Sequence, residues 1–189
     1  MKRDIILAGV GGQGILTIAT IIGYAAVERG LSLKQAEVHG MSQRGGDVQS
    51  HLRISDKAIY SDLIPEGRAD LIIGIEPMET LRYTSYLAPE GWLITNKKPF
   101  VNITDYPDYE TVWKEIEDLP RSILVDGEKL AREVATARSM NMVILGASSP
   151  FLDIPAEELE GAIQAIFARK GEAIVEQNIA AFRAGRAFA

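Results

Sequence analysis

The segment from Gly9 to Gly14 is the feature that most constrains the fold of this chain. It follows the apolar run Ile5–Ala8, and four apolar residues in a row are typical of a strand buried in a parallel sheet. Glycine adopts backbone angles that other residues avoid, so the segment breaks the strand. We therefore expect a strand over 3–8, a turn, and a helix over 15–29 that ends with Gly30 as its C-terminal cap.

The rest of the chain alternates strand-like runs with helical segments. Strands are expected over 34–38, 48–54, 70–75, 92–95 and 122–125, and helices over 79–87, 109–117, 128–138, 155–168 and 172–184. Residues 141–147 fit either pattern, and we assign a helix because a strand there would lack a crossover. Residues 48–54 alternate apolar and polar side chains, which favours a strand with one wetter face, nearer an edge.

This alternation predicts an α/β fold, a Rossmann-like three-layer sandwich with a mostly parallel sheet and helices on both faces. The chain has 189 residues, which fits a single domain over 1–189. There is no cysteine, so the chain supplies no thiolate to an iron–sulfur cluster and is not a thiol enzyme. Only two histidines are present, and no ligand spacing indicates a metal site. The net charge is -6 without a block of like charges, which argues against nucleic-acid binding.

No charged residue occurs from Ile5 to Val27, and Lys2 and Arg3 precede that run. Such a run resembles a signal peptide or a membrane helix, but the glycines of the turn and Gln13 interrupt it. We therefore expect a cytoplasmic protein that does not enter a membrane. A helix that is apolar nearly all round is usually buried all round, either by a partner chain or by the C-terminal helices of the same chain.

Gly9, Gly11 and Gly14 form a G-x-G-x-x-G pattern between the expected strand and helix. The start of a helix offers free N–H groups and the positive end of the helix dipole, which suits a phosphate. Glu37 lies 23 residues beyond Gly14, about where a dinucleotide-binding fold has its ribose-binding acid. The alternative is a tight strand–helix turn without a ligand.

A second loop, Arg44-Gly45-Gly46, follows the second expected strand. Loops at the carboxyl ends of strands gather beside the first glycine turn in a doubly wound sheet. The guanidinium of Arg44 would then face an anion, or it would simply point into solvent. His39 is an acid–base candidate by residue type, although such a histidine is more often only hydrogen-bonded. With no G-x-S-x-G elbow and no G-x-x-x-x-G-K-[ST] loop, the chain offers a binding surface without evident catalytic groups.

Several longer stretches carry further information. They are Gly9-Val10-Gly11-Gly12-Gln13-Gly14, Glu37-Val38-His39-Gly40-Met41-Ser42-Gln43-Arg44-Gly45-Gly46, Asp70-Leu71-Ile72-Ile73-Gly74-Ile75-Glu76-Pro77, Asn141-Met142-Val143-Ile144-Leu145-Gly146-Ala147, and the tail from Lys170-Gly171 through Asn178 to Ala181-Phe182. Together they resemble the gamma-type subunits of 2-oxoacid:ferredoxin oxidoreductases along almost the whole chain. The loop that begins at His39 is similar to the version found in members that act on indolepyruvate.

The resemblance implies coenzyme A-dependent oxidative decarboxylation of an arylpyruvate, giving an aryl-acetyl-CoA, carbon dioxide and reduced ferredoxin. It implies thiamine diphosphate and iron–sulfur clusters in a larger alpha subunit, so that this chain binds no cofactor and is inactive alone. It suggests a site for the phosphate-bearing part of coenzyme A, or for one wall of its channel, made of Gly9, Gly11, Gly12, Gln13, Gly14, Arg44, Gly45 and Gly46, without catalytic residues or metal ligands. A stand-alone dinucleotide-binding dehydrogenase domain and a purely structural subunit are the alternatives.

Overall fold

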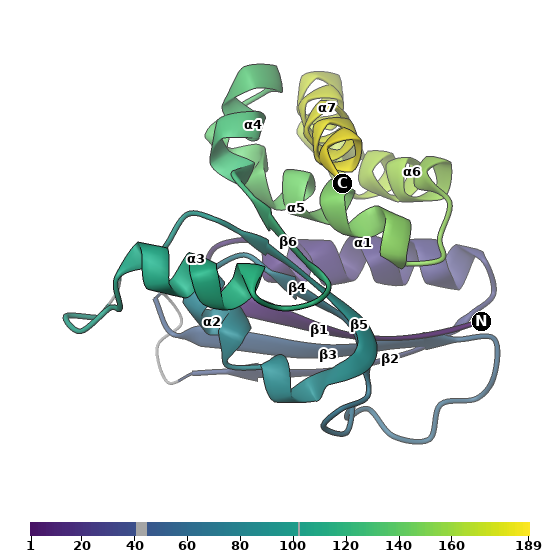
Figure 1. Ribbon diagram of the computed structural model, residues 1–189. Helices are drawn as coiled ribbons and strands as arrows, with labels where there is room; N and C mark the ends of the chain where they lie inside the picture. Colours follow the sequence, from purple (N-terminus) through teal and green to yellow (C-terminus); the bar gives the residue numbers. More distant parts are fainter. Residues whose placement is uncertain (41–44, 102) are drawn as a thin grey trace.

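The computed structural model describes residues 1–40, 45–101 and 103–189. Its strands form one six-stranded sheet in the order β2-β3-β1-β4-β5-β6 (Figure 1). The strands are β1 (Lys2–Val10), β2 (Ser32–His39), β3 (Asp47–Ser55), β4 (Ala69–Gly74), β5 (Leu87–Asn96) and β6 (Ser122–Val125). The helices are α1 (Ile15–Glu28), α2 (Pro77–Leu81), α3 (Tyr109–Glu117), α4 (Gly127–Val134), α5 (Met140–Ser148), α6 (Ala156–Phe167) and α7 (Glu172–Phe188).

The sheet is mixed, and among the described strands β3 alone runs against the others. β1, β4, β5 and β6 pair in parallel, whereas β3 is antiparallel to both β1 and β2. The predicted α/β fold with a mostly parallel sheet is therefore confirmed. β3 lies one strand in from the edge, directly beside the edge strand β2, which agrees with the expected place of 48–54 nearer an edge.

The alternation in β3 has a different cause from the one expected. One face of β3 packs against α1 through Val48, Leu52 and Ile54, which are buried. On the other face of β3 lies the loop between β3 and β4, which two side chains of the strand hold in place. Arg53 donates to the backbone carbonyls of residues 61 and 63, and His51 Nδ1 accepts from the amide of residue 64. The backbone groups of a covering loop need polar side chains as partners, whereas a covering helix needs apolar ones. The alternation of apolar and polar residues in β3 therefore indicates what packs on each face of the strand, and not where the strand lies in the sheet.

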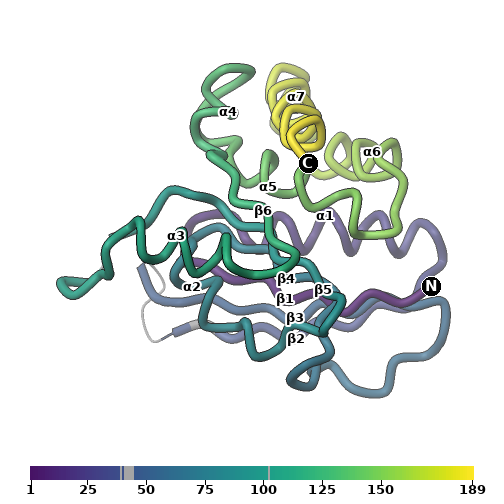
Figure 2. The backbone as a smooth tube through the Cα atoms, in the orientation of Figure 1, coloured from purple at the N-terminus to yellow at the C-terminus, as the bar shows by residue number. Residues whose placement is uncertain are grey.

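Helices cover both faces of the sheet, as the predicted sandwich requires (Figure 1). α2 and α3 pack on one face around Ile6, Ile72 and Leu93, whereas α1 and α5 pack on the other. A further layer, made of α4, α6 and α7, lies outside α1 and α5. The backbone trace in Figure 2 begins in the sheet and ends in this outer layer.

The first helix ends where the sequence predicts. Gly30 has a φ of 73°, and its amide donates to the carbonyl of Val27 at 2.8 Å, while the amide of Leu31 donates to the carbonyl of Ala26 at 3.0 Å. These two bonds form a Schellman motif, which needs the left-handed conformation that glycine adopts readily. The helix assigned to 141–147 is also confirmed, as α5.

α6 and α5 pack over α1, so the expectation of cover by C-terminal helices is confirmed for that side of the helix. The other side of α1 stays open to solvent at Leu16, Thr20, Tyr24 and Val27, which follow one another at helical spacing. We call these four residues the open side of α1. Among the residues that the structure describes, no helix is both long and apolar enough to span a membrane.

Candidate functional site

The glycine turn joins the end of β1 to the start of α1, and Gln13 closes it. The backbone amide of Gln13 donates to the carbonyl of Val10 at 3.2 Å, and its side-chain Oε1 accepts from the Val10 amide at 2.9 Å. Both the N–H and the carbonyl of Val10 are therefore hydrogen-bonded to Gln13 within the turn. Gln13, predicted as part of a binding site, has an evident role in holding the shape of that turn.

Two glycines of the turn, Gly9 and Gly14, serve close packing as well as turning. A Cβ on Gly9 would lie 2.8 Å from Ile15 Cδ1, and a Cβ on Gly14 would lie 2.5 Å from Asn141 Nδ2. Gly14 also has a φ of 87°, which other residues rarely adopt. Gly12 has a φ of 96° but open space around it. Packing accounts for Gly9 and Gly14, whereas at Gly12 only the backbone angle calls for glycine.

Four backbone amides near the turn donate to no group within the described part of the chain. They belong to Gly12, Gly14, Ile15 and Leu16, and no side chain caps the start of α1. A helix start with unsatisfied amides carries partial positive charge, which favours an anion. The turn therefore keeps the donors that a phosphate would need.

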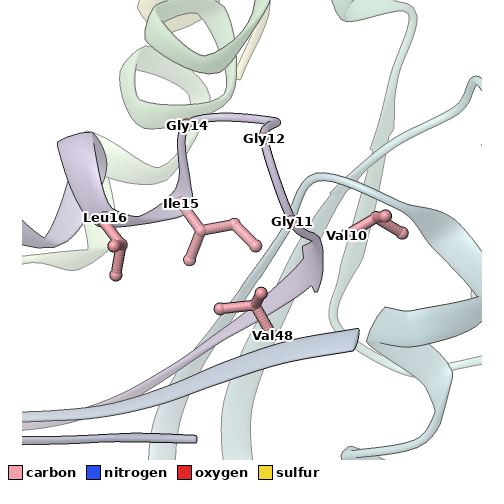
Figure 3. Close-up of a pocket in the computed structure, with 7 residues that line it drawn as sticks. All are labelled: Val10, Gly11, Gly12, Gly14, Ile15, Leu16 and Val48. Atoms are coloured by element: carbon pink, nitrogen blue, oxygen red, sulfur yellow. The ribbon is translucent and has the colours of Figure 1, made fainter. Parts of the chain in front are cut away.

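A cavity of about 300 Å³ lies beside these amides. Figure 3 shows Ile15 from α1 and Val48 from β3 facing one another, with Gly12 and Gly14 above them, and Gly11 also lines the cavity. Val10 and Leu16 complete the lining, so the described walls are apolar side chains and glycine backbone. Such a cavity suits an uncharged chain or ring next to a group that accepts hydrogen bonds from amides.

The second predicted loop lies against the first. The amide of Gly11 donates to the carbonyl of Gly46 at 2.9 Å, which joins the turn to the segment just before β3. Gly45 has a φ of 82°. Arg44 and the side chain of His39 lie outside the described residues, so their roles stay predictions. The gathering of the two loops at one edge is confirmed for Gly46, and it uses the Gly11 amide that a phosphate would otherwise bind.

Glu37 does not occupy the position of a ribose-binding acid. It pairs with Ser50 on β3, which in turn pairs with Leu7 on β1. In a dinucleotide-binding fold the strand that carries this acid lies directly beside the first strand. Here an antiparallel strand separates the two, so the geometric basis of the dehydrogenase alternative is absent.

A buried carboxylate that the sequence did not reveal lies at the same edge of the sheet. Glu76, which is 1% exposed, follows β4 and accepts hydrogen bonds from the amide of Glu79 at 2.7 Å, from the amide of Phe100 at 3.2 Å and from the hydroxyl of Tyr106. It thereby caps α2 and holds the loop that follows β5. The acid before Pro77 was a visible capping signal, but its bonds to residues 24 and 30 positions later were not.

Burial shapes the ionisation of the groups around Glu76. Burial raises the pKa of Tyr106, and its hydrogen bond to Glu76 raises it further. Burial also raises the pKa of Glu79, partly offset by the Arg82 guanidinium, whose Nε lies 3.0 Å from Glu79 Oε2. Burial raises the pKa of Tyr83 to about 12. Among the described residues no cluster of His, Asp or Glu could hold a metal ion. The hydrogen bonds that Glu76 accepts from Glu79, Phe100 and Tyr106 make it a structural anchor.

Comparison with known proteins decides the family. A family described as "Pyruvate ferredoxin/flavodoxin oxidoreductase" matches residues 4–188. The chain belongs to this family. It is 36% identical to the protein named "Indolepyruvate oxidoreductase subunit IorB" of Pyrococcus horikoshii, over 97% of this chain and 94% of that protein. The resemblance to the gamma-type subunits is thus confirmed.

Two solved structures share the fold. One is a 2-oxoglutarate:ferredoxin oxidoreductase from Magnetococcus marinus with 2-oxoglutarate, coenzyme A and succinyl-CoA bound, with a TM-score of 0.78 and 24% identity. The whole of this chain matches 31% of that chain, so the fold is there one part of a larger polypeptide. The other is pyruvate oxidoreductase subunit PORC of Thermotoga maritima, with a TM-score of 0.72 and 22% identity over 99% of this chain and 96% of that one.

Proposed function

We propose that this chain, folded as a single domain over 1–189, is the small subunit of a cytoplasmic heteromeric indolepyruvate:ferredoxin oxidoreductase. Family membership and the relative named as an indolepyruvate oxidoreductase subunit support this function. In the reaction an arylpyruvate loses carbon dioxide, its acyl group passes to coenzyme A, and two electrons pass to ferredoxin. The larger subunit would hold thiamine diphosphate and the iron–sulfur clusters, since this chain has no cysteine to ligate a cluster.

Within that enzyme, the glycine turn and the Arg44-Gly45-Gly46 loop would hold the phosphate-bearing part of coenzyme A. The observation that carries this proposal is the hydrogen bond from Gly11 to Gly46, which brings the second loop against the turn. Beside it lie the free amides at the start of α1 and the apolar cavity. The amides would bind a phosphate, and the apolar walls would contact the uncharged arm that follows it.

The test is an Arg44→Ala variant of the assembled enzyme. A hydrogen bond to a charged group contributes about 1.5–3 kcal/mol, so the Michaelis constant for coenzyme A should rise by about tenfold or more. Steady-state kinetics with coenzyme A as the varied substrate measure it. Arg29→Ala is the matched control, because Arg29 lies at the far end of α1 and pairs with Glu158 at 2.7 Å. An unchanged Michaelis constant in the Arg44 variant would overturn the role of this loop.

A purely structural subunit is the second candidate, and the packing at Gly9 and Gly14 favours it because both glycines are explained without a ligand. Amide exchange of residues 9–16 separates the two. Protection by coenzyme A supports the binding role. If neither coenzyme A nor NAD protects these amides, the turn serves only to pack β1 against α1.

A further inference from the structure

A second and larger cavity lies on the other side of Gly14. It has a volume of about 700 Å³ and is bounded by the starts of α1, α5 and α7 and by the end of α6. Asn141 belongs to its wall and also donates from Nδ2 to the carbonyl of Gly14 at 3.4 Å. The stretches that resemble the gamma-type subunits include Lys170, Asn178 and Asn141. The proposed function assigns these three residues no role. We infer that this cavity binds the phosphate of a nucleotide-like organic molecule.

The charge of the wall points to an anion. Arg138 and Lys170 line the cavity, and none of its described lining residues carries a carboxylate. The chain as a whole carries 26 acidic and 20 basic side chains, so a cavity with two cations and no acid departs from the rest of the surface. Neither cation forms an ion pair within the described part of the chain. Two cations without an ion-pair partner among the described residues suit a doubly charged phosphate.

The backbone adds to this positive charge. Thr17 lies in the first turn of α1, Asn141 in the first turn of α5 and Ile174 in the first turn of α7, and all three face the cavity. The starts of three helices therefore border one space, and each helix start carries partial positive charge. Glu172, the acid in the first turn of α7, is exposed and does not line the cavity.

The remaining lining points to an organic molecule rather than a bare ion. Asn178 is 8% exposed, and its Nδ2 donates to the carbonyl of Ile174 at 2.7 Å, which leaves its Oδ1 as an acceptor. Gln177 and Thr17 add an amide and a hydroxyl. Phe167 and Ile174 supply apolar surface, and Lys170 Nζ lies 5.0 Å from the centroid of the Phe167 ring. Neutral polar groups and apolar surface beside two cations fit a sugar and base attached to a phosphate.

This inference does not rest on the proposed function, because its residues differ from the glycine turn and Arg44. The phosphate has two possible sources, the 3′-phosphate of coenzyme A or a separate nucleotide. The probe that carries the shared chemistry is adenosine 3′,5′-bisphosphate. Titrated into the isotope-labelled full chain, it should shift the amide resonances of residues 136–141 and 170–178.

The double substitution Arg138→Gln and Lys170→Gln should weaken binding of the bisphosphate by about tenfold or more, since two charge-assisted contacts are lost. The matched control is Lys129→Gln with Arg132→Gln, which removes the same charge from a surface that Asp126, Glu128 and Glu133 share. No binding by the wild-type chain, or an equal loss in both double variants, would overturn the inference. Circular dichroism checks that the variants fold, and all four substituted side chains are exposed.

Two further ligands separate the sources. If coenzyme A loses affinity in the Arg138/Lys170 variant and dephospho-coenzyme A does not, its 3′-phosphate occupies the cavity. If only the bisphosphate loses affinity, a separate nucleotide is the ligand. Each result keeps the cavity as a phosphate site, and neither depends on the outcome of Arg44→Ala.

Discussion

α5 has no charged residue and α1 has none before Glu28, its last residue, yet the two helices are covered to different extents. α5 is enclosed, with every residue from Met142 to Ser148 buried between the sheet and the outer helices. α1 is enclosed on one side only, and its open side exposes Leu16, Thr20, Tyr24 and Val27. A helix without charged residues is therefore expected to be buried, but the sequence does not show whether its own chain or a partner chain buries it.

The cover of α5 is unusually close because glycines meet on both helices. A Cβ on Gly146 of α5 would lie 1.9 Å from the carbonyl oxygen of Phe182 on α7. A Cβ on Gly185 of α7 would lie 1.9 Å from the carbonyl oxygen of Val143 on α5. At these two points backbone packs directly on backbone, so neither position has room for a methyl group.

The largest effect expected from this comparison is that of Gly146→Ala. The added methyl meets backbone, which moves only with its helix, so the free energy of unfolding should fall by about 3 kcal/mol or more. Denaturant-induced unfolding measures it. Gly161→Ala on α6 is the matched control, because a Cβ there meets nothing within 4 Å. It should stabilise the chain by up to about 1 kcal/mol. A small loss at Gly146 would contradict the close approach of α5 and α7.

A smaller effect is expected for Gly23→Ala on the buried side of α1. Its Cβ would lie 3.2 Å from Leu33 Cδ2, the end of a flexible side chain that can shift. The gain in helix propensity, about 1 kcal/mol, offsets the cost of that shift, so the free energy of unfolding should change by less than about 1 kcal/mol. The same unfolding experiment applies, and a loss as large as that at Gly146 would show that α1 is packed as rigidly as α5.

The smallest effect on stability is expected at the open side of α1, for Tyr24→Lys. A substitution at an exposed position changes the free energy of unfolding by about 0.5 kcal/mol or less. If the open side contacts the larger subunit of the proposed enzyme, the same change should weaken assembly, measured by co-elution of the two subunits. Tyr60→Lys, at a tyrosine that is 95% exposed in a loop, is the matched control.

The isolated chain offers a second check on the open side. An apolar surface without its cover favours self-association, so sedimentation should show dimers or larger species at high concentration. A stable monomer at high concentration, together with normal assembly of the Tyr24→Lys variant, would show that the open side contacts solvent in the enzyme as well.

Local signals in the sequence predicted most elements of the fold. The helix over 109–117 and the strand over 122–125 have the predicted bounds, because caps and apolar runs mark their ends. Local signals do not determine the order of the strands in the sheet. The position of β3 between β1 and β2 depends on pairing between distant residues, and apolar alternation reports only which face of a strand is covered.

The sequence also predicted one part of the candidate site and not another. The general rule that loops meet at the carboxyl ends of strands predicted that the second loop would approach the turn, and the bond from Gly11 to Gly46 agrees with it. No such rule pointed to Glu76, whose partners Phe100 and Tyr106 are close only once β4 and β5 pair. The place of Arg44 stays a prediction.

The arrangement of β1 also has a consequence for the order of folding. Ile5 pairs with Leu52 on one side and with Leu71 on the other, which lie 47 and 66 residues further along the chain. Closing such long loops costs entropy before the contacts form, so the central strand acquires its neighbours late and slowly. Until then β1 is an apolar strand with two unpaired edges, and an incompletely folded chain would aggregate through it.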